Sequence, residues 1–191
     1  AIAITQDLAQ FIRDYTPNLA LFKKLKATNV CDGQRVLLNW ARALRGETVA
    51  PTSLTDEAFD EAAYVETYRG NSFFTICYAV TKLQLCYLFG EYDKALEVAR
   101  LGRGIIHHLE GTIWPVIFEF WNGLTLAANY ADAAEDERKI YLAEMEEARR
   151  WFAVLAANCP TTRRGRGVRD RSASRAPRPS APASGAPGCD G

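Results

Sequence analysis

Apolar residues recur three and four positions apart along most of this chain, and no segment shows the strict alternation of a half-buried strand. Such spacing is typical of amphipathic helices that bury one face and leave the other in water. The pattern therefore predicts an all-α fold, in which helices are separated by short turns and by one loop at residues 49–51.

The first 46 residues are predicted to hold three helical segments. An apolar stripe begins at Leu8 and is expected to stop at Pro17, because proline lacks a backbone N–H and clashes with the preceding turn. A second stripe covers residues 19–25. A longer helix is expected over residues 30–44, closed by Gly46.

The stretch after the loop is predicted to form a further helix. Ser53 or Thr55 is positioned to cap its start. Asp56 and Glu57 would then lie in the first turn, where carboxylates complement the helix dipole. Gly70 is expected to end this helix.

The clearest helical pattern lies between residues 71 and 109. Asn71 or Ser72 is expected to cap a helix, and Gly90 is expected to end it by adopting the left-handed backbone conformation. A second helix over residues 92–109 would complete a helical hairpin. The residues expected to point inward from the first helix are Phe73, Ile76, Cys77, Val80, Leu83 and Tyr87.

A second hairpin is predicted over residues 115–158. Pro115 suits the first turn of a helix, where its missing N–H has no helical partner to lose. A polar corner at residues 132–136 separates this helix from the last one. The buried stripes are predicted as Ile117, Phe120, Trp121, Leu124 and Ala128 in the first helix, and Tyr141, Met145, Ala148, Phe152 and Leu155 in the second.

The two hairpin corners, at Gly90 and near Asp132, repeat with a period of 42 residues. This period falls among degenerate helical repeats, beyond the roughly 34 residues of a tetratricopeptide unit. A single hairpin cannot bury its apolar face, so neighbouring hairpins must stack on it. The predicted fold is a tetratricopeptide-like α-α superhelix of stacked hairpins, which forms one domain over residues 1–160.

Composition changes sharply after Pro160. Residues 161–191 hold seven arginines and two acids, a net charge of +5, and contain almost no large apolar residue. The preceding 160 residues carry 16 basic and 21 acidic groups, a net charge of −5. We expect the tail to be disordered. It is either a flexible linker or the product of a GC-rich gene read out of frame. The start at Ala1 indicates a fragment of a longer protein.

Residues capable of chemistry are present but not arranged as a known site. His107 and His108 are adjacent, so on a helix they point about 100° apart and do not readily share a metal. The five cysteines form no C-x-x-C pair and are expected to be reduced and buried. The chain is therefore predicted to be a non-enzyme without a cofactor or metal of its own.

Four aromatic residues offer one candidate site. The side chains of Trp114, Phe118, Trp121 and Tyr130 have the spacing to surround a ligand pocket on one helix. Aromatic residues at helical spacing are more often part of a core, and that interpretation stays open beside the first.

Several spaced residues together resemble one protein family. They are Thr55-Asp56-Glu57-x-Phe59-Asp60-Glu61, Tyr87-Leu88-Phe89-Gly90-Glu91-Tyr92-x-x-Ala95-Leu96, Leu109-x-Gly111, Phe118-x-Phe120-Trp121-x-x-Leu124-x-Leu126-Ala127, Glu137-Arg138, and Trp151 with Asn158-Cys159-Pro160. This pattern resembles the tetratricopeptide-like region of large bacterial multidomain signalling kinases. In that family a serine/threonine-kinase-like domain and an AAA-type ATPase module precede the region, and GAF or PAS sensors with a histidine kinase follow it.

The resemblance spans about residues 30–160 and implies parentage, because no ATP-binding or phosphoacceptor residue of the family lies in this chain. It implies a cytoplasmic, non-catalytic scaffold that relays change between neighbouring domains of the parent, with ATP and Mg²⁺ bound only elsewhere in that parent. The alternative is a regulatory ligand- or peptide-binding domain of an ATPase-linked transcriptional regulator. Partners are expected to be protein segments, with no nucleic acid and no membrane span.

Overall fold

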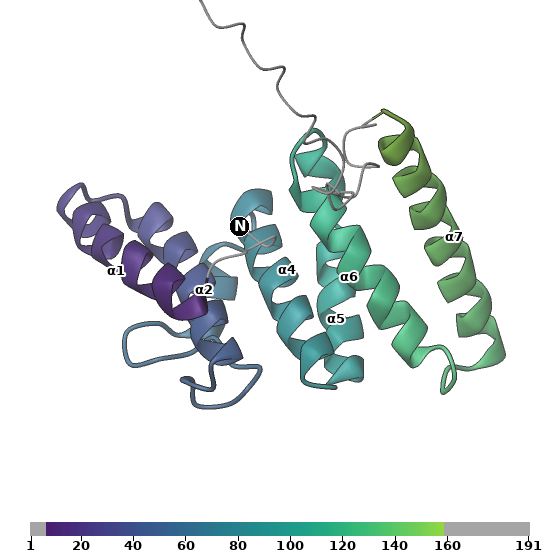
Figure 1. Ribbon diagram of the computed structural model, residues 1–191, viewed down its shortest axis with the longest axis horizontal. Coiled ribbons are helices and arrows are strands. Elements are labelled where there is room, and N and C mark those ends of the chain that lie inside the picture. The colour runs from purple at the N-terminus through teal and green to yellow at the C-terminus, as the bar shows by residue number, and fades with distance from the viewer. Residues whose placement is uncertain (1–6, 159–191) are drawn as a thin grey trace, which may run out of the picture. The chain divides into compact units, whose positions relative to one another are not determined.

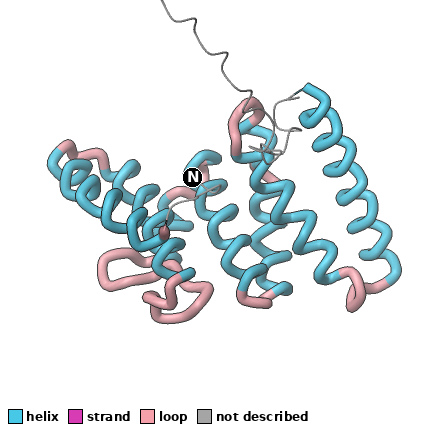
Figure 2. Tube along the Cα trace, viewed as in Figure 1, coloured by secondary structure: helices cyan, strands magenta, loops and turns pink. Residues whose placement is uncertain are grey.

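The structure of the chain is a computed structural model that describes residues 7–158. Within this range the prediction of an all-α fold is confirmed, and no strand is formed (Figure 1, Figure 2). The helices are α1 (Leu8–Lys24), α2 (Thr28–Leu44), α3 (Glu61–Thr67), α4 (Ser72–Leu88), α5 (Tyr92–Arg103), α6 (Trp114–Asn129) and α7 (Glu135–Asn158), with a 3-10 helix η1 (Ile106–Leu109) before α6. The predictions for residues 161–191 lie outside the described residues.

Helix α1 runs through Pro17, so the prediction that this residue ends the helix is wrong. An internal proline costs a helix about 3 kcal/mol, but both apolar stripes then lie on one helix that packs along α2. Phe11 is buried there, and Ile12 and Leu19 pack against the same core. Tertiary packing on both sides of the proline outweighs its local penalty.

The helix after the loop starts later than predicted. Thr55 and Asp56 belong to a turn instead, in which the backbone N–H of Asp56 donates to the carbonyl of Phe59 at 3.0 Å. Helix α3 begins at Glu61 because the side chain of Asp60 caps it, accepting a hydrogen bond from the N–H of Ala63 at 2.7 Å.

The α4–α5 hairpin has the predicted form. The Asn71 side chain caps α4 by accepting from the N–H of Phe74 at 3.2 Å, and Gly90 turns the chain with a φ of 76°. Helix α4 is the most buried helix and lies beside α2, α5 and α6 (Figure 1). The prediction that Phe73 points inward is wrong, because this residue is 46 % exposed.

Two clusters of buried residues make up the interior. The first joins α1, α2, the loop, α3 and the α4 residues Tyr78 and Leu85 around Leu38, Trp40 and Leu54. The second joins α4, α5, η1 and α6 around Leu83 and Phe118. Helix α4 contributes to both clusters and so links the two halves of the interior.

The predicted helix over residues 92–109 is divided in two. Helix α5 ends at Arg103, and residues Ile106–Leu109 form η1 instead. Gly102 and Gly104 weaken the helix at this point, because glycine is about 1 kcal/mol less favourable than alanine in a helix interior. Gly102 also admits the ring of Phe118 from α6, so the chain uses this position for close packing.

Helix α6 buries a face that overlaps the predicted one only in part, since Ile117 and Trp121 of the predicted stripe pack against the second core cluster. The predicted stripe included Phe120, whose side chain is 52 % exposed, whereas Phe118, Asn122, Thr125 and Leu126 are buried. Apolar residues lie on several sides of this helix, so the period alone does not select one side. Insertion of Phe118 beside Gly102 selects the face that the structure uses.

Candidate interaction groove

A groove lies between α5, α6 and α7, with a volume of about 280 Å³. We call it the α5–α6–α7 groove. Its apolar lining is contributed by Leu96, Ala99, Leu126, Ile140 and Tyr141. Helix α7 contributes Tyr141, its only fully buried residue within the described range, to the groove wall.

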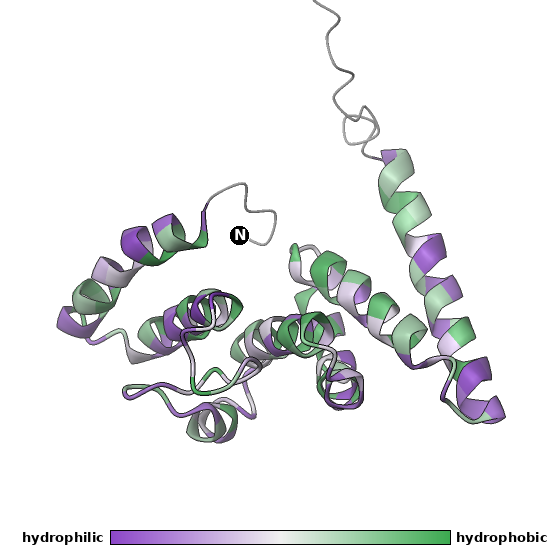
Figure 3. Ribbon diagram, turned by 60° about the horizontal axis from the view of Figure 1, so that its bottom comes forward, coloured by the Kyte–Doolittle hydropathy of each residue, from purple (hydrophilic) through white to green (hydrophobic). Residues whose placement is uncertain are grey.

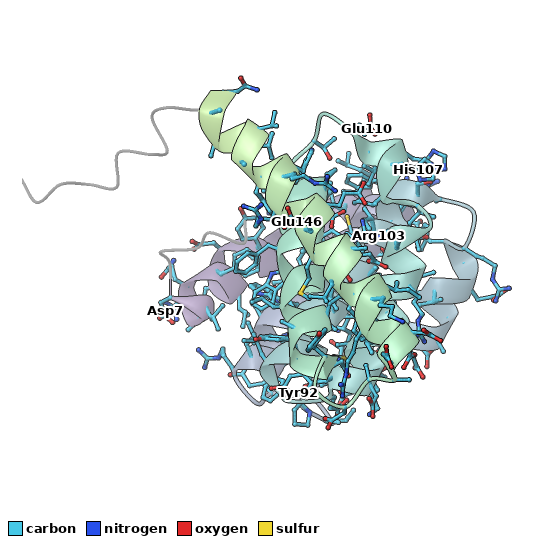
Figure 4. The ribbon with its side chains drawn as sticks, turned by 90° about the vertical axis from the view of Figure 1, so that its right-hand side faces the viewer. Asp7, Tyr92, Arg103, His107, Glu110 and Glu146 are labelled. Carbon is cyan, nitrogen blue, oxygen red and sulfur yellow. The ribbon has the colours of Figure 1, made fainter. Side chains whose placement is uncertain are left out.

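The polar lining of the groove centres on Arg103 at the end of α5. Its guanidinium forms a two-pronged ion pair with Glu119 of α6 and a further contact of 3.3 Å with Glu144 of α7 (Arg103 is labelled in Figure 4). Burial is the largest influence on the pKa of the Arg103 guanidinium and lowers it, but the hydrogen bonds and negative charges of Glu119 and Glu144 together outweigh burial, and the pKa is raised. The guanidinium also lies 5.2 Å from the centre of the Phe118 ring. One side chain thus connects three helices.

A second polar contact holds the start of α7. Arg138 donates to the carbonyl of Tyr130 at 3.1 Å and to that of Ala131 at 2.5 Å. These two carbonyls lie just past the end of α6, where helical carbonyls lack partners. Helix α7 is therefore attached by charged contacts near its start and by Tyr141, rather than by a broad apolar face.

Helix α7 carries unburied apolar side chains, of which Ile140 lines the groove and Leu142 and Val154 do not. Ile140 and Leu142 are 56 % and 51 % exposed, and Val154 is exposed as well. Along α7, hydrophobic and hydrophilic residues alternate on the ribbon (Figure 3).

The four predicted pocket residues do not surround the groove or the other described cleft. Phe118 is fully buried in the second core cluster, and Trp114 and Trp121 pack against that cluster. Trp121 lies beside Tyr87, with the ring centres 5.6 Å apart. Tyr130 lies at the end of α6 with the Arg138 guanidinium over its ring. The structure brings three of the four toward one core and leaves Tyr130 apart.

The sequence held a partial signal for the groove. Tyr141 belongs to a predicted apolar stripe, and the structure places it on the groove wall. Arg103 stands between Gly102 and Gly104, a local pattern that does not indicate an ion pair. Its ion pairs with Glu119 and Glu144 join residues 16 and 41 positions apart, a spacing that no local pattern reveals.

The histidine pair lies at the surface on η1, with ring centres 3.9 Å apart (His107 is labelled in Figure 4). In the described part of the chain, no three His, Cys, Asp or Glu side chains cluster at metal-binding distance. Burial raises the pKa of Cys77 to about 12 and that of Cys86 to about 11. Both thiols therefore stay protonated at neutral pH and are poor nucleophiles.

Comparisons of the chain with protein-family models, with curated proteins and with solved structures return no match. Several of the residues that carry the resemblance to signalling kinases serve the packing and turns of the fold. Gly90 forms the hairpin corner, and Ala95, Phe118 and Leu126 are buried. None of the helices within residues 7–158 has the length and apolarity needed to span a bilayer.

Proposed function

We propose that this chain is a non-catalytic helical scaffold of a bacterial multi-sensor signal-transduction kinase, in which it relays conformational change between neighbouring domains. In this proposal α4–α5 and α6–α7 are successive hairpins of a tetratricopeptide-like stack. The observation that carries it is the α5–α6–α7 groove, where one helix is attached mainly by charged contacts and leaves apolar residues uncovered.

The groove suits a peptide segment. Its volume of about 280 Å³ is small beside the ~300–1,000 Å³ of sites that enclose a drug-sized ligand. Such a space accepts one or two side chains of a segment lying along α7. An apolar side chain of the segment would pack against Leu96, Leu126 and Ile140.

The charge of the groove predicts which segment binds. Arg100 lines the groove, is exposed, and forms no ion pair with any residue of the described range. An acidic residue next to an apolar one in the bound segment would pair with it. Occupation of the groove by a neighbouring domain would press on α7, and the Arg103–Glu144 contact would transmit that displacement to α5 and α6.

The experiment that tests this proposal is selection of dodecapeptides from a random library on the purified full chain. Recovered peptides should place an apolar residue next to an acidic one. Their affinity should fall by about tenfold in Ile140→Ser and in Arg100→Glu, which change exposed groove residues without touching the core.

The matched control is Leu142→Ser, which removes a similarly exposed apolar side chain of α7 that does not line the groove. Equal losses in Ile140→Ser and Leu142→Ser would mean that the peptide binds another face of α7. The purified chain should also hydrolyse no ATP, and measurable hydrolysis would contradict the scaffold proposal.

A further inference from the structure

A second cleft, distinct from the groove, opens where α1 meets α2. Its volume is about 500 Å³, and we call it the α1–α2 cleft. Three cationic side chains line it, Lys23 at the end of α1, Lys26 in the connecting turn and Arg35 on α2. Cations from three consecutive parts of the chain thus converge on one space.

These charges are not neutralised by the surrounding protein. Within residues 7–158 no carboxylate forms an ion pair with Lys23, Lys26 or Arg35. Arg35 is held in place by donating to the carbonyl of Ala58, which also lines the cleft. Asp32 is the one acid of the described lining, and it already accepts a hydrogen bond from the Tyr68 hydroxyl at 2.9 Å.

The start of α2 adds to the positive character of the cleft. The residue before the helix is Ala27, which has no capping side chain, and the first turn of α2 contains no acid. Thr28 and Cys31 of this turn line the cleft. A helix start that lacks both a capping side chain and an acid in its first turn presents the positive end of the helix dipole to a ligand in the cleft.

Lys26 is held in an unusual backbone conformation. It is the one non-glycine residue with positive φ in the described range, at 55°, and its N–H donates to the carbonyl of Lys23 at 3.1 Å. Glycine or asparagine would adopt this conformation more readily than lysine. The turn therefore fixes the backbone of Lys26 at the edge of the cleft, which Lys26 lines.

We propose that the α1–α2 cleft binds a small hydroxylated organic phosphate of the sugar-phosphate class. The phosphoryl group would pair with Lys23 and Lys26 at the start of α2, where both charge and helix dipole favour an anion. The second oxygen of the Asp32 carboxylate would accept from a ligand hydroxyl. A cleft of about 500 Å³ lies within the ~300–1,000 Å³ range of small-molecule sites.

A small anion is favoured over a polyanion. Residues 1–160 carry a net charge of −5, which repels nucleic acid and highly phosphorylated chains while leaving a local cationic cleft effective at short range. The site lies on α1 and α2, whereas the proposed peptide groove lies on α5–α7. The two proposals therefore stand or fall separately.

Isothermal titration of the full chain with ribose 5-phosphate tests this inference, with ribose and a phosphoserine peptide as comparison ligands. Ribose 5-phosphate should bind saturably, and ribose should not bind. Lys23→Gln and Lys26→Asn should each weaken binding by about tenfold or more. Asparagine is chosen at position 26 because it tolerates positive φ.

Lys24→Gln is the matched control, because Lys24 is the exposed neighbour of Lys23 on α1 and does not line the cleft. Its affinity should equal that of the unaltered chain. The inference is overturned by an absence of saturable binding, by equal weakening in Lys24→Gln, by comparable binding of ribose, or by binding of the phosphoserine peptide alone. Unchanged circular dichroism spectra of all three variants would establish that the fold is intact and that differences in affinity arise in the cleft.

Discussion

Gly102 of α5 lies directly against the ring of Phe118 of α6, so closely that a Cβ at position 102 would overlap the ring and lie 3.0 Å from its Cδ2. Phe118 is fully buried at this point. The contact sets how near α5 and α6 approach, and it also places Arg103, the next residue, between Glu119 and Glu144. The contact between Gly102 and Phe118 thus fixes both the packing of α5 against α6 and the position of Arg103 in the groove.

Gly102→Ala should destabilise the protein. Alanine gains about 1 kcal/mol of helix propensity, but overpacking against a buried ring costs typically 1–3 kcal/mol. We expect a net loss of up to about 2 kcal/mol in the free energy of unfolding, measured by urea denaturation.

Gly123→Ala on α6 is the matched control for that substitution. Nothing lies within 4 Å of a Cβ at position 123, so propensity acts alone and stability should rise by up to about 1 kcal/mol. A Gly102→Ala variant as stable as Gly123→Ala would mean that the Phe118 ring does not restrict this position.

Lys82→Met should destabilise the protein strongly. The Lys82 ammonium lies 2.5 Å from a carboxylate oxygen of Glu61, and both side chains are largely buried. Removing one partner leaves the other charge buried without compensation, which costs about 3–5 kcal/mol. Lys94→Met provides the comparison, because Lys94 pairs with Glu91 at an exposed site and should change stability by less than about 1 kcal/mol.

A double-mutant cycle separates the pair from its surroundings. Glu61 also accepts from the Tyr78 hydroxyl at 2.8 Å and from the N–H of Leu54 at 3.0 Å. Glu61→Gln with Lys82→Met should therefore lose less than the sum of the two single losses. Strict additivity of the two would contradict the pairing.

Glu144→Gln should loosen the first half of α7. The substitution removes the charge that Arg103 contacts at 3.3 Å, while leaving the side-chain shape intact. Hydrogen exchange of the amides around residues 137–150 should become faster, and the amides of α4 should be unchanged. Glu146→Gln is the control on the same helix, since within residues 7–158 Glu146 forms its ion pair with the exposed Arg149 and not with Arg103. Faster exchange in both variants would show that the contact to Arg103 is not specific.

Stability should fall at alkaline pH. Burial raises the pKa of Cys77 to about 12 from an ordinary value of 9.0, so the unfolded chain releases this proton at lower pH than the folded one. The contribution is complete below about pH 9 and is lost as pH rises toward 12, by about 1.4 kcal/mol per pH unit at most. Urea denaturation should show a smaller alkaline loss in Cys77→Ala than in the unaltered chain. An identical slope would contradict the raised thiol pKa.

Sequence alone predicted the helices whose signals are local. Asn71 and Gly90 are the cap and the corner that the sequence indicated, because each acts through its own backbone or side chain. The prediction at Pro17 was wrong because packing along α2 outweighs a local penalty. The buried face of α6 was misassigned because it depends on Gly102, a residue of another helix.

The candidate sites were less accessible from sequence than the helices. Trp114 and Trp121 attracted attention as large aromatics, yet both pack against the core. The groove depends on Arg103 and on where α7 meets α5 and α6, and these contacts join distant parts of the chain. Local periodicity identifies a buried stripe, but it does not report which neighbouring helix leaves that stripe partly uncovered.

We propose above all that the α5–α6–α7 groove receives a peptide segment. Nuclear magnetic resonance titration of the full chain with a selected dodecapeptide tests it most directly. The largest amide shifts should fall on groove residues such as Ala99, Ile140 and Tyr141, with those of α1 and α2 unmoved. Largest shifts on α1 and α2, or no shift at saturating peptide, would contradict the claim.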